Sequence, residues 1–327
     1  MNKIKQALKY SFEVIKPSIM TTNYYLGNYK DVIWLIGDGR SGTTWVSDLI
    51  NWEKSYREMF EPFHPRCVKE MGFLAPHQYI RPNDAKHPLL DIASDVFSGK
   101  FTNKRIDAQN SRLFYRGLLV KDIFANLFAA WVSKQFPTIK IILLIRNPFA
   151  VALSKFKKKS WYWLTNPKEF LNQELLCNDY LQPFEGVIKD VGDDYIERQV
   201  LIWSIIHYVP FLQLDLNQIH ILFYEDIIAN PKEELFRLFR YIKPNGNKNA
   251  IEEMFKIYSR PSRMSRKGSN IVIRNPLTGN WKKELSVKQI HKGLKILNCF
   301  GLDKIYGEDS MPRKGTLEKL LKHFSTA

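Results

Sequence analysis

The segment DVIWLIGDGRSGTTWVSDLI, residues 31–50, decides the fold. Residues 31–37 (DVIWLIG) are almost wholly apolar, as in a parallel strand that is covered on both faces. The turn GDGRSGTTW (37–45) follows, and residues 43–52 have the composition of a helix. A glycine-rich turn between a strand and a helix N-terminus gathers backbone amides around one point. This segment therefore predicts an anion-binding loop.

Two further apolar runs predict buried strands, at 139–146 (IKIILLIR) and 219–224 (IHILFY). A stretch of helical composition precedes each of them, at 121–136 and at 196–214. Alternating strands and helices predict an α/β fold. We expect a P-loop-like, three-layer arrangement in which helices flank a central, mainly parallel sheet.

The chain shows no internal repeat and no obvious linker, so we expect a single domain over residues 1–327. Residues 1–30 are expected to form an N-terminal helical extension, and residues 312–327 a C-terminal helix. Polar, proline- or glycine-containing stretches at 76–88 and 259–281 predict long loops. Loops of this length often carry function.

The composition favours anionic partners, because 49 Lys and Arg against 33 Asp and Glu give a net charge of +16. Nucleic acid, a membrane surface, an acidic glycan and a phosphorylated nucleotide all fit this charge. The three cysteines form no CxxC pair, so neither a disulfide framework nor a zinc site is predicted. Because no window approaches the roughly 18 apolar residues of a membrane span, we expect a cytoplasmic protein without stable membrane insertion. Contact of an amphipathic N-terminal helix with a membrane stays open.

The loop nearly matches the nucleoside-triphosphate pattern GxxxxGK[ST], counted from Gly37 to Gly42. Thr43, however, occupies the place of the lysine that reaches the β- and γ-phosphates. The cation lies instead at Arg40, and no clear acidic residue marks a magnesium site. A P-loop kinase is therefore a disfavoured alternative, and no metal is expected.

GDGRSGTTW resembles the 5′-phosphosulfate loop of sulfotransferases, whose usual form is PxSGTTW with lysine or arginine at x. The resemblance implies an enzyme that binds 3′-phosphoadenosine 5′-phosphosulfate (PAPS) and transfers its sulfuryl group. It assigns Arg40 to the bridging oxygen and phosphate, and Trp45 to the border of the adenine. The other loop residues that it assigns to the nucleotide are Ser41, Gly42, Thr43 and Thr44.

Residues 141–154 (IILLIRNPFAVALS) resemble the 3′-phosphate motif of the same family, with Arg146 after a strand and Ser154 eight positions later. A guanidinium group binds phosphate through paired charge-assisted hydrogen bonds, and a helical serine adds a donor. Residues 222–231 (LFYEDIIANP) are similar to a late strand and turn of the family, which implies that Tyr224 lies near the adenine.

The resemblance also implies a basic clamp on the 3′-phosphate, formed by Arg266, Lys267 and Gly268. These residues precede GNWK at 279–282, which is similar to the family's GDWK, although the gap between the two motifs is longer than usual. A second RKG at 313–315 shows that this tripeptide is common in a basic chain.

Sulfuryl transfer needs a base for the acceptor proton and cations near the leaving phosphate, and Arg40 and Lys121 suit the second role. Ile123 stands where the branch acting on phenols and steroids has its histidine. Residues 58–65 (EMFEPFHP) are similar instead to the FEP segment of carbohydrate sulfotransferases. Glu61 is thus the first candidate for the base, with a pKa that nearby apolar residues would raise. His64 is the second candidate, and Asp122 a distant third.

The acceptor is expected to be a small molecule or a glycan, with a carbohydrate or other alcohol favoured over nucleic acid. The run KFKKKSWYW (155–163) permits nucleic-acid binding or sugar stacking, but also a solvated helix end followed by a lipophilic cover over the acceptor. A non-catalytic module that binds nucleotides or polyanions is the alternative from a different class. Such a module would need no base.

Overall fold

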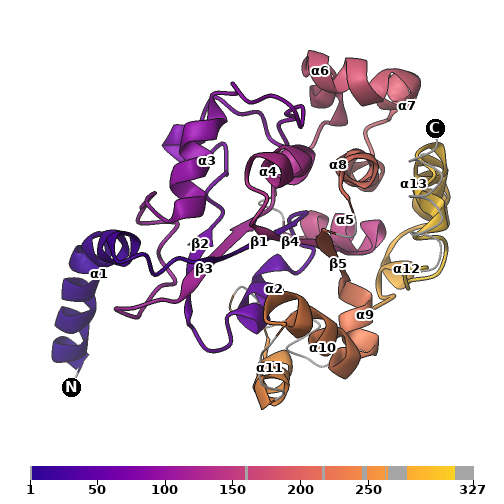
Figure 1. The fold of residues 1–327 in the computed structure, drawn as a ribbon. Helices are drawn as coiled ribbons and strands as arrows, with labels where there is room; N and C mark the ends of the chain where they lie inside the picture. Colours follow the sequence, from indigo (N-terminus) through magenta and orange to yellow (C-terminus); the bar gives the residue numbers. More distant parts are fainter. Residues whose placement is uncertain are drawn as a thin grey trace.

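The computed structural model describes residues 2–158, 161–215, 218–244, 249–261, 263 and 278–313. Its core is a five-stranded sheet whose strand pairs are all parallel, in the order β2-β3-β1-β4-β5 (Figure 1). The strands are β1 (Asp31–Gly37), β2 (Tyr56–Phe60), β3 (Gly117–Asp122), β4 (Lys140–Ile145) and β5 (Ile219–Phe223). The predicted α/β fold with a parallel sheet is confirmed.

Helices cover both faces of the sheet (Figure 1). On one face lie α3 (Leu89–Ser98), α4 (Ala129–Gln135), α5 (Pro148–Lys157), α8 (Tyr195–Gln213) and α13 (Val287–Cys299). On the other lie α2 (Thr43–Ile50), α9 (Tyr224–Ala229), α10 (Pro231–Ile242) and α11 (Asn249–Tyr258). Short helices complete the described part of the chain: η1 (Lys69–Met71), η2 (Asn126–Phe128), η3 (Pro167–Asn172), α6 (Glu174–Leu176), η4 (Cys177–Leu181), η5 (Gln182–Phe184), α7 (Glu185–Asp190), α12 (Trp281–Glu284) and η6 (Leu302–Lys304).

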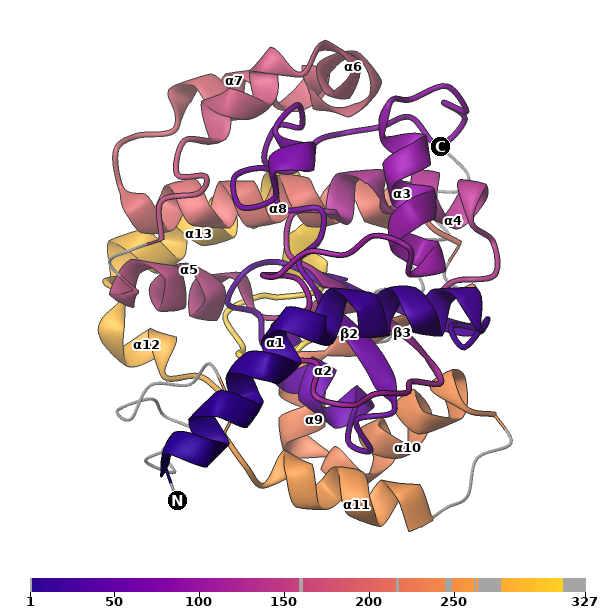
Figure 2. The ribbon, with the colours of Figure 1, turned by 90° about the vertical axis from the view of Figure 1, so that its left-hand side faces the viewer.

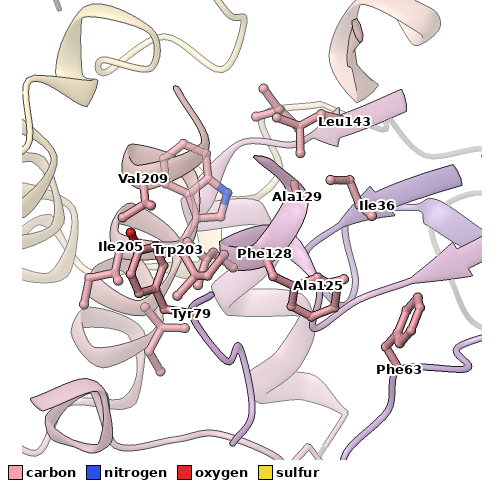
Figure 3. Packing of buried hydrophobic residues seen from close by; sticks show 14 of the residues in the cluster. Ile36, Phe63, Tyr79, Ala125, Phe128, Ala129, Leu143, Trp203, Ile205 and Val209 are labelled. Atoms are coloured by element: carbon pink, nitrogen blue, oxygen red, sulfur yellow. The ribbon is translucent and has the colours of Figure 1, made fainter. Parts of the chain in front are cut away.

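Strand β1 contributes side chains to two hydrophobic cores, because successive side chains of a strand point to opposite faces of the sheet. Trp34 and Ile36 belong to the larger core, in which Phe63, Phe128 and Trp203 also pack (Figure 3). The alternate residues of β1 belong to the core that α2, α10 and α11 cover. This burial on both faces explains the uninterrupted apolar run from which β1 was predicted.

The predicted strands at 31–37, 139–146 and 219–224 correspond to β1, β4 and β5, and the predicted helix at 196–214 corresponds to α8. The helix predicted over 121–136 is wrong in its first part. Lys121 and Asp122 end β3, and regular α-helix begins only at Ala129. The run GLLV (117–120) supplies the apolar residues that make this segment a strand between β1 and β2.

The N-terminal helix α1 (Asn2–Tyr25) lies at the β2 edge of the molecule (Figures 1 and 2). The Asn23 side chain holds it there, since its amide donates to the carbonyl of Leu113 at 2.6 Å and its oxygen accepts from the backbone of Tyr115 at 3.0 Å. Among the described residues no helix has the length and apolar character that a membrane crossing requires. Residues 314–327, where most of the C-terminal helix was predicted, lie outside the described part of the chain.

Candidate active site

The glycine-rich loop connects the carboxyl end of β1 to the first turn of α2. Gly42 has a φ of 105°, and its carbonyl accepts the backbone hydrogen bonds that open the helix, from Trp45 and Val46 at 3.0 Å each. Arg40 has a φ of 72°, which is uncommon for a residue with a side chain. The Ser41 hydroxyl donates to the carbonyl of Asp38 at 2.6 Å, so it closes the turn from within. The loop therefore presents backbone amides and the N-terminus of α2 to one side.

Five residues of the predicted nucleotide set meet at this loop. The Arg40 Nε donates to the Ser154 hydroxyl at 3.2 Å, and Arg146 donates to the Arg40 carbonyl at 3.1 Å. The Arg146 guanidinium also lies 4.2 Å from the ring centre of Tyr224, which contacts Trp45 edge to face at 5.6 Å. Segments that are more than 100 residues apart in the chain are thus brought to one point.

Two buried donors at this point have no hydrogen-bond partner among the described residues: the Nε of Arg146 and the Nε1 of Trp45. Buried polar groups are nearly always hydrogen-bonded in proteins. A guanidinium with an unpaired N–H beside an anion-binding loop, packed on Tyr224, is suited to a phosphate attached to a flat base.

A cleft of about 420 Å³ opens in front of the loop. The predicted site residues that line it are Arg40, Gly42, Thr43, Thr44, Trp45, Glu61, His64, Lys121, Arg146 and Tyr224. The cleft is also lined by Gly39, Phe60, Arg105, Ile123 and Lys158, and by Trp161, Tyr162 and Trp163 from the predicted lipophilic cover. Ser41 and Ser154 lie beside the cleft through their contacts with the loop, whereas Arg266, Lys267 and Gly268 lie outside the described residues.

Glu61 lies at the end of β2 and is held from several directions. Its carboxylate accepts from Lys121 at 2.7 Å and from Arg105 at 2.6 Å. Its backbone N–H donates to the Lys121 carbonyl at 2.7 Å, and its φ is 53°. A left-handed conformation in a residue with a side chain persists only where the surroundings fix it, and such residues cluster at functional sites.

The expected rise in the pKa of Glu61 is wrong. Burial acts to raise the pKa of this carboxyl, but the charges and hydrogen bonds of Lys121 and Arg105 outweigh it, so the pKa is lowered. The carboxylate is therefore ionised at neutral pH. A base in this form can accept a proton, although the two cations weaken its proton affinity.

His64 and Asp122 lie in different surroundings. The Nδ1 of His64 accepts from the backbone N–H of Arg66 at 3.2 Å, and its ring lies between Phe124 and Trp163. Burial lowers the pKa of His64 to about 4, so the ring is neutral at pH 7. Asp122 accepts from Trp34 at 3.0 Å inside the larger core, where burial raises its pKa to about 7. Its two hydrogen bonds to the core, one from Trp34 and one from the backbone of residue 63, explain it as a structural residue.

Arg105 is a cation bound to Glu61 that the sequence did not reveal. It comes from the irregular segment between α3 and β3, and its guanidinium reaches over the Phe60 ring at 5.4 Å to Glu61. The surrounding sequence, FTNKRIDAQN, contains no motif and no periodicity. No local signal could have singled this residue out.

The basic run after Ser154 is only partly a solvated helix end. Lys155 is buried and paired with Asp38, whereas Lys157 is exposed and pairs with Glu284. Trp161, Tyr162 and Trp163 line the cleft, as expected of a lipophilic cover. Lys159 and Ser160 lie outside the described residues.

Gly39 occupies the place of the proline in the loop form PxSGTTW, and the Trp161 indole lies directly on it. A Cβ built on Gly39 would come within 2.0 Å of the Cη2 of Trp161. Any larger residue at position 39 must therefore displace the indole. The glycine was predicted to permit a tight turn, and the structure adds close packing against an aromatic wall of the cleft.

Gly39→Ala is expected to lower the free energy of unfolding by about 1 kcal/mol, the low end of the cost of overpacking, because the half-buried Trp161 indole can move toward the cleft. Urea unfolding measures this loss. Gly192→Ala is the matched control, since a Cβ there meets nothing within 4 Å. Trp161→Ala in the Gly39→Ala background should remove the clash, so strictly additive losses in the double variant would contradict the contact.

Within the described residues, no group of three or more His, Cys, Asp or Glu side chains could hold a metal ion. The charged groups that line the cleft are five cations and one carboxylate: Arg40, Arg105, Lys121, Arg146 and Lys158 with Glu61. The cleft is thus built for an anionic ligand.

Residues 30–299 match the sulfotransferase domain. The chain therefore belongs to the sulfotransferase family, and the resemblance carried by GDGRSGTTW is confirmed. Among solved structures it is similar to the mouse sulfotransferase SULT7A1 complexed with PAP, with 14% identity over 94% of this chain and 95% of that one and a TM-score of 0.43. It is also similar to the sulfotransferase domain from the curacin biosynthetic pathway, with 15% identity over 83% and 97% and a TM-score of 0.45.

Proposed function

We propose that the chain transfers the sulfuryl group of PAPS to an acceptor hydroxyl, in the cleft in front of the glycine-rich loop. The observation that carries this proposal is the meeting of Arg40, Arg146 and Ser154 beside the amides of the loop. This arrangement offers one anion site at the loop and a second at Arg146. The rings of Trp45 and Tyr224 are available to the adenine of a nucleotide whose phosphates occupy these two sites. A nucleotide with a phosphate at each end of its ribose fits such a pair of sites.

The reaction is an in-line displacement at sulfur. The acceptor oxygen forms the new S–O bond while the bond to the bridging oxygen breaks, and that oxygen leaves with the electron pair on the 5′-phosphate. Arg40 and the loop amides stabilise the charge that collects there. Glu61, ionised at neutral pH, takes the proton of the acceptor hydroxyl. Lys121 and Arg105 contact Glu61 and line the cleft, so an anion bound there would share these cations with the carboxylate.

For the acceptor we propose a carbohydrate or another alcohol with a flat apolar face. Trp161, Tyr162 and Trp163 supply aromatic surface to the cleft. Aromatic rings bind sugars and other flat ligands by stacking. Ile123, which stands where the branch acting on phenols and steroids has its histidine, also lines the cleft and offers no proton-accepting atom. We therefore assign the base to Glu61, which lines the same cleft.

The nucleotide is tested by thermal unfolding with and without adenosine 3′,5′-bisphosphate (PAP), and with ATP for comparison. PAP at about 100 times its dissociation constant should add roughly 2.7 kcal/mol to the free energy of unfolding, which raises the midpoint. Arg146→Ala should abolish this shift, because it removes the guanidinium beside the loop.

The outcomes separate the candidate functions. A shift with PAP that is weaker with ATP supports the sulfuryl-donor nucleotide. A larger shift with ATP, dependent on magnesium, would instead favour a kinase. If millimolar PAP leaves the midpoint unchanged, the proposed nucleotide is wrong.

A further inference from the structure

An acidic residue lies inside the anion-binding loop. Asp38, the second residue of the loop, is 1% exposed, and both of its carboxylate oxygens accept from the Nζ of Lys155, at 2.8 and 2.7 Å. Lys155 itself is 2% exposed. A carboxylate beneath a loop that binds phosphate opposes that binding unless its charge is cancelled. Lys155 is the cation that cancels it.

The pair also joins the two halves of the proposed nucleotide site. Lys155 follows Ser154 on α5, and the Ser154 hydroxyl accepts from Arg40 of the loop. The carbonyl of Asp38 in turn accepts the hydroxyl and the backbone N–H of Ser41. A shift of α5 relative to the loop would therefore separate a buried ion pair, which proteins tolerate poorly.

The Trp161 indole packs against this junction. Its indole lies on Gly39, next to Asp38 in the chain, and the Nζ of Lys155 lies 5.4 Å from its ring centre. At such a buried site the charge of an unpaired carboxylate would be screened weakly. Burial acts to raise the pKa of Asp38 and to lower that of Lys155, and each partner opposes the shift of the other.

We propose that Lys155 is a positioning residue for nucleotide binding. It neutralises Asp38 beneath the glycine-rich loop and holds helix α5 against that loop, so that Arg40 and Ser154 stay together. The inference rests on the proposed function in that PAP is taken as the ligand of the loop. What the inference adds is that Lys155 cancels the negative charge of Asp38 beneath the loop.

The experiment compares PAP affinity, by isothermal titration calorimetry at pH 8, in variants that each remove one member of the pair. Lys155→Met leaves the carboxylate unpaired and should weaken PAP binding by about tenfold or more. Asp38→Asn removes the negative charge beneath the loop and should bind PAP at least as tightly as the wild type. The neutral double variant, Asp38→Asn with Lys155→Met, should recover much of the affinity lost in Lys155→Met.

Two further variants complete the series. Lys155→Arg keeps the charge and should retain affinity, and it stays informative if Lys155→Met fails to fold. Lys157→Met removes a cation from the same helix, where the lysine side chain is 56% exposed, and should change PAP affinity little. The unfolding midpoint of each variant without ligand records its structural loss.

Opposite effects of Lys155→Met and Asp38→Asn on affinity support the proposal, since a merely structural pair would lose affinity in both. Equal weakening in the two single variants, in step with their midpoints, would overturn it. Titration with inorganic pyrophosphate repeats the comparison without a nucleotide. If the wild type binds pyrophosphate but not PAP, and the opposite effects appear with pyrophosphate, the proposed nucleotide fails while the role of Lys155 stands.

Discussion

Glu61→Gln is expected to reduce turnover by about 10²- to 10³-fold while the stabilisation by PAP persists. Glutamine keeps the size of the side chain and can still accept a hydrogen bond from Lys121, but it cannot take a proton from the acceptor. Lys121 and Arg105 hold the Glu61 carboxylate, whereas Arg146 donates to the Arg40 carbonyl at the loop, so the nucleotide half of the cleft should remain intact. A non-catalytic binding module would show no such separation of turnover from affinity.

The measurement uses PAPS with a labelled sulfuryl group and an alcohol, phenol or sugar that the wild type accepts in a screen. Glu70→Gln, at an exposed position, is the matched control and should leave turnover unchanged. His64→Asn tests the second candidate for the base. If the histidine variant loses turnover and Glu61→Gln does not, the assignment of the base is reversed.

The pH dependence of turnover should agree with this role. Because Lys121 and Arg105 lower the pKa of Glu61 against the effect of burial, the carboxylate stays ionised down to below the ordinary pKa of glutamate. If Glu61 is the base, the plot of turnover against pH should thus show no fall on the acid side until the pH drops below the ordinary pKa of glutamate. A fall in turnover at a pH closer to 7 would indicate that another group is the base.

The sequence predicted those parts of the fold whose cause is local. Strands β1, β4 and β5 are buried on both faces and read as unbroken apolar runs. Strand β2 could not be predicted in this way, because Arg57 and Glu58 lie within it and are nevertheless buried. Their burial depends on partners elsewhere in the chain, such as Asp107, which is 50 residues away.

The residues of the candidate site likewise fall into those with a local sequence signal and those without one. Arg40, Arg146 and Tyr224 stand in recognisable segments at strand ends, and the parallel sheet brings those ends to one edge. Arg105 and the buried pair of Asp38 with Lys155 have no such local mark. Lys155 in particular belongs to a run of lysines whose other described members are not buried. Only the packing of α5 against the loop distinguishes it.

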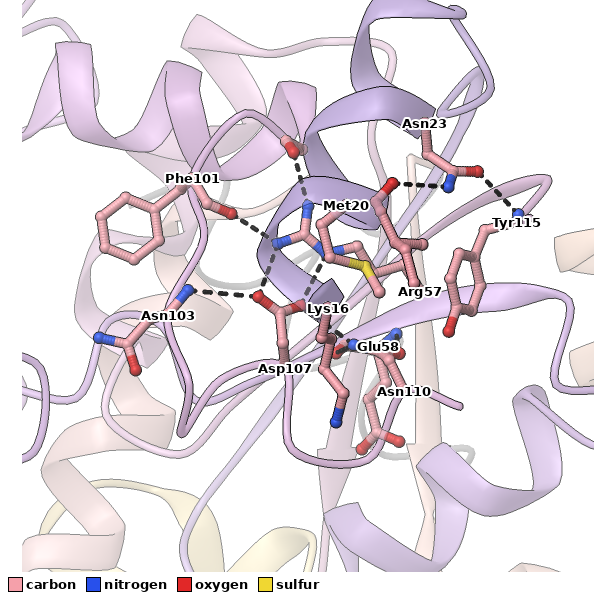
Figure 4. A network of polar contacts seen from close by, with 12 residues as sticks. Lys16, Met20, Asn23, Arg57, Glu58, Phe101, Asn103, Asp107, Asn110 and Tyr115 are labelled. Carbon is pink, nitrogen blue, oxygen red and sulfur yellow. Dashed lines mark hydrogen bonds and ion pairs between the residues drawn. The ribbon is translucent and has the colours of Figure 1, made fainter. Parts of the chain in front are cut away.

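Arg57→Met is expected to lower the free energy of unfolding by about 3–5 kcal/mol, because it leaves a buried carboxylate without its cation. Arg57 is fully buried in β2 and binds Asp107 through two nitrogens, at 2.7 and 2.9 Å (Figure 4). It also donates to the carbonyls of Gly99 and Phe101 at 2.5 and 2.6 Å. These bonds connect β2 to the segment that carries Arg105, so the loss should also loosen the hold on Glu61.

Urea unfolding measures the loss, with Arg81→Met as the control. Arg81 also binds a carboxylate through two nitrogens, that of Asp179, but its side chain is 48% exposed and water replaces the lost contact. The unfolding midpoint of Arg81→Met should therefore move far less than that of Arg57→Met. Adding Asp107→Leu to Arg57→Met should restore only part of the stability, because Asp107 also accepts from the backbone of Asn103 and the side chain of Asn110. Equal losses in the exposed and the buried arginine variants would contradict this account, since they would mean that burial does not set the cost of the broken pair.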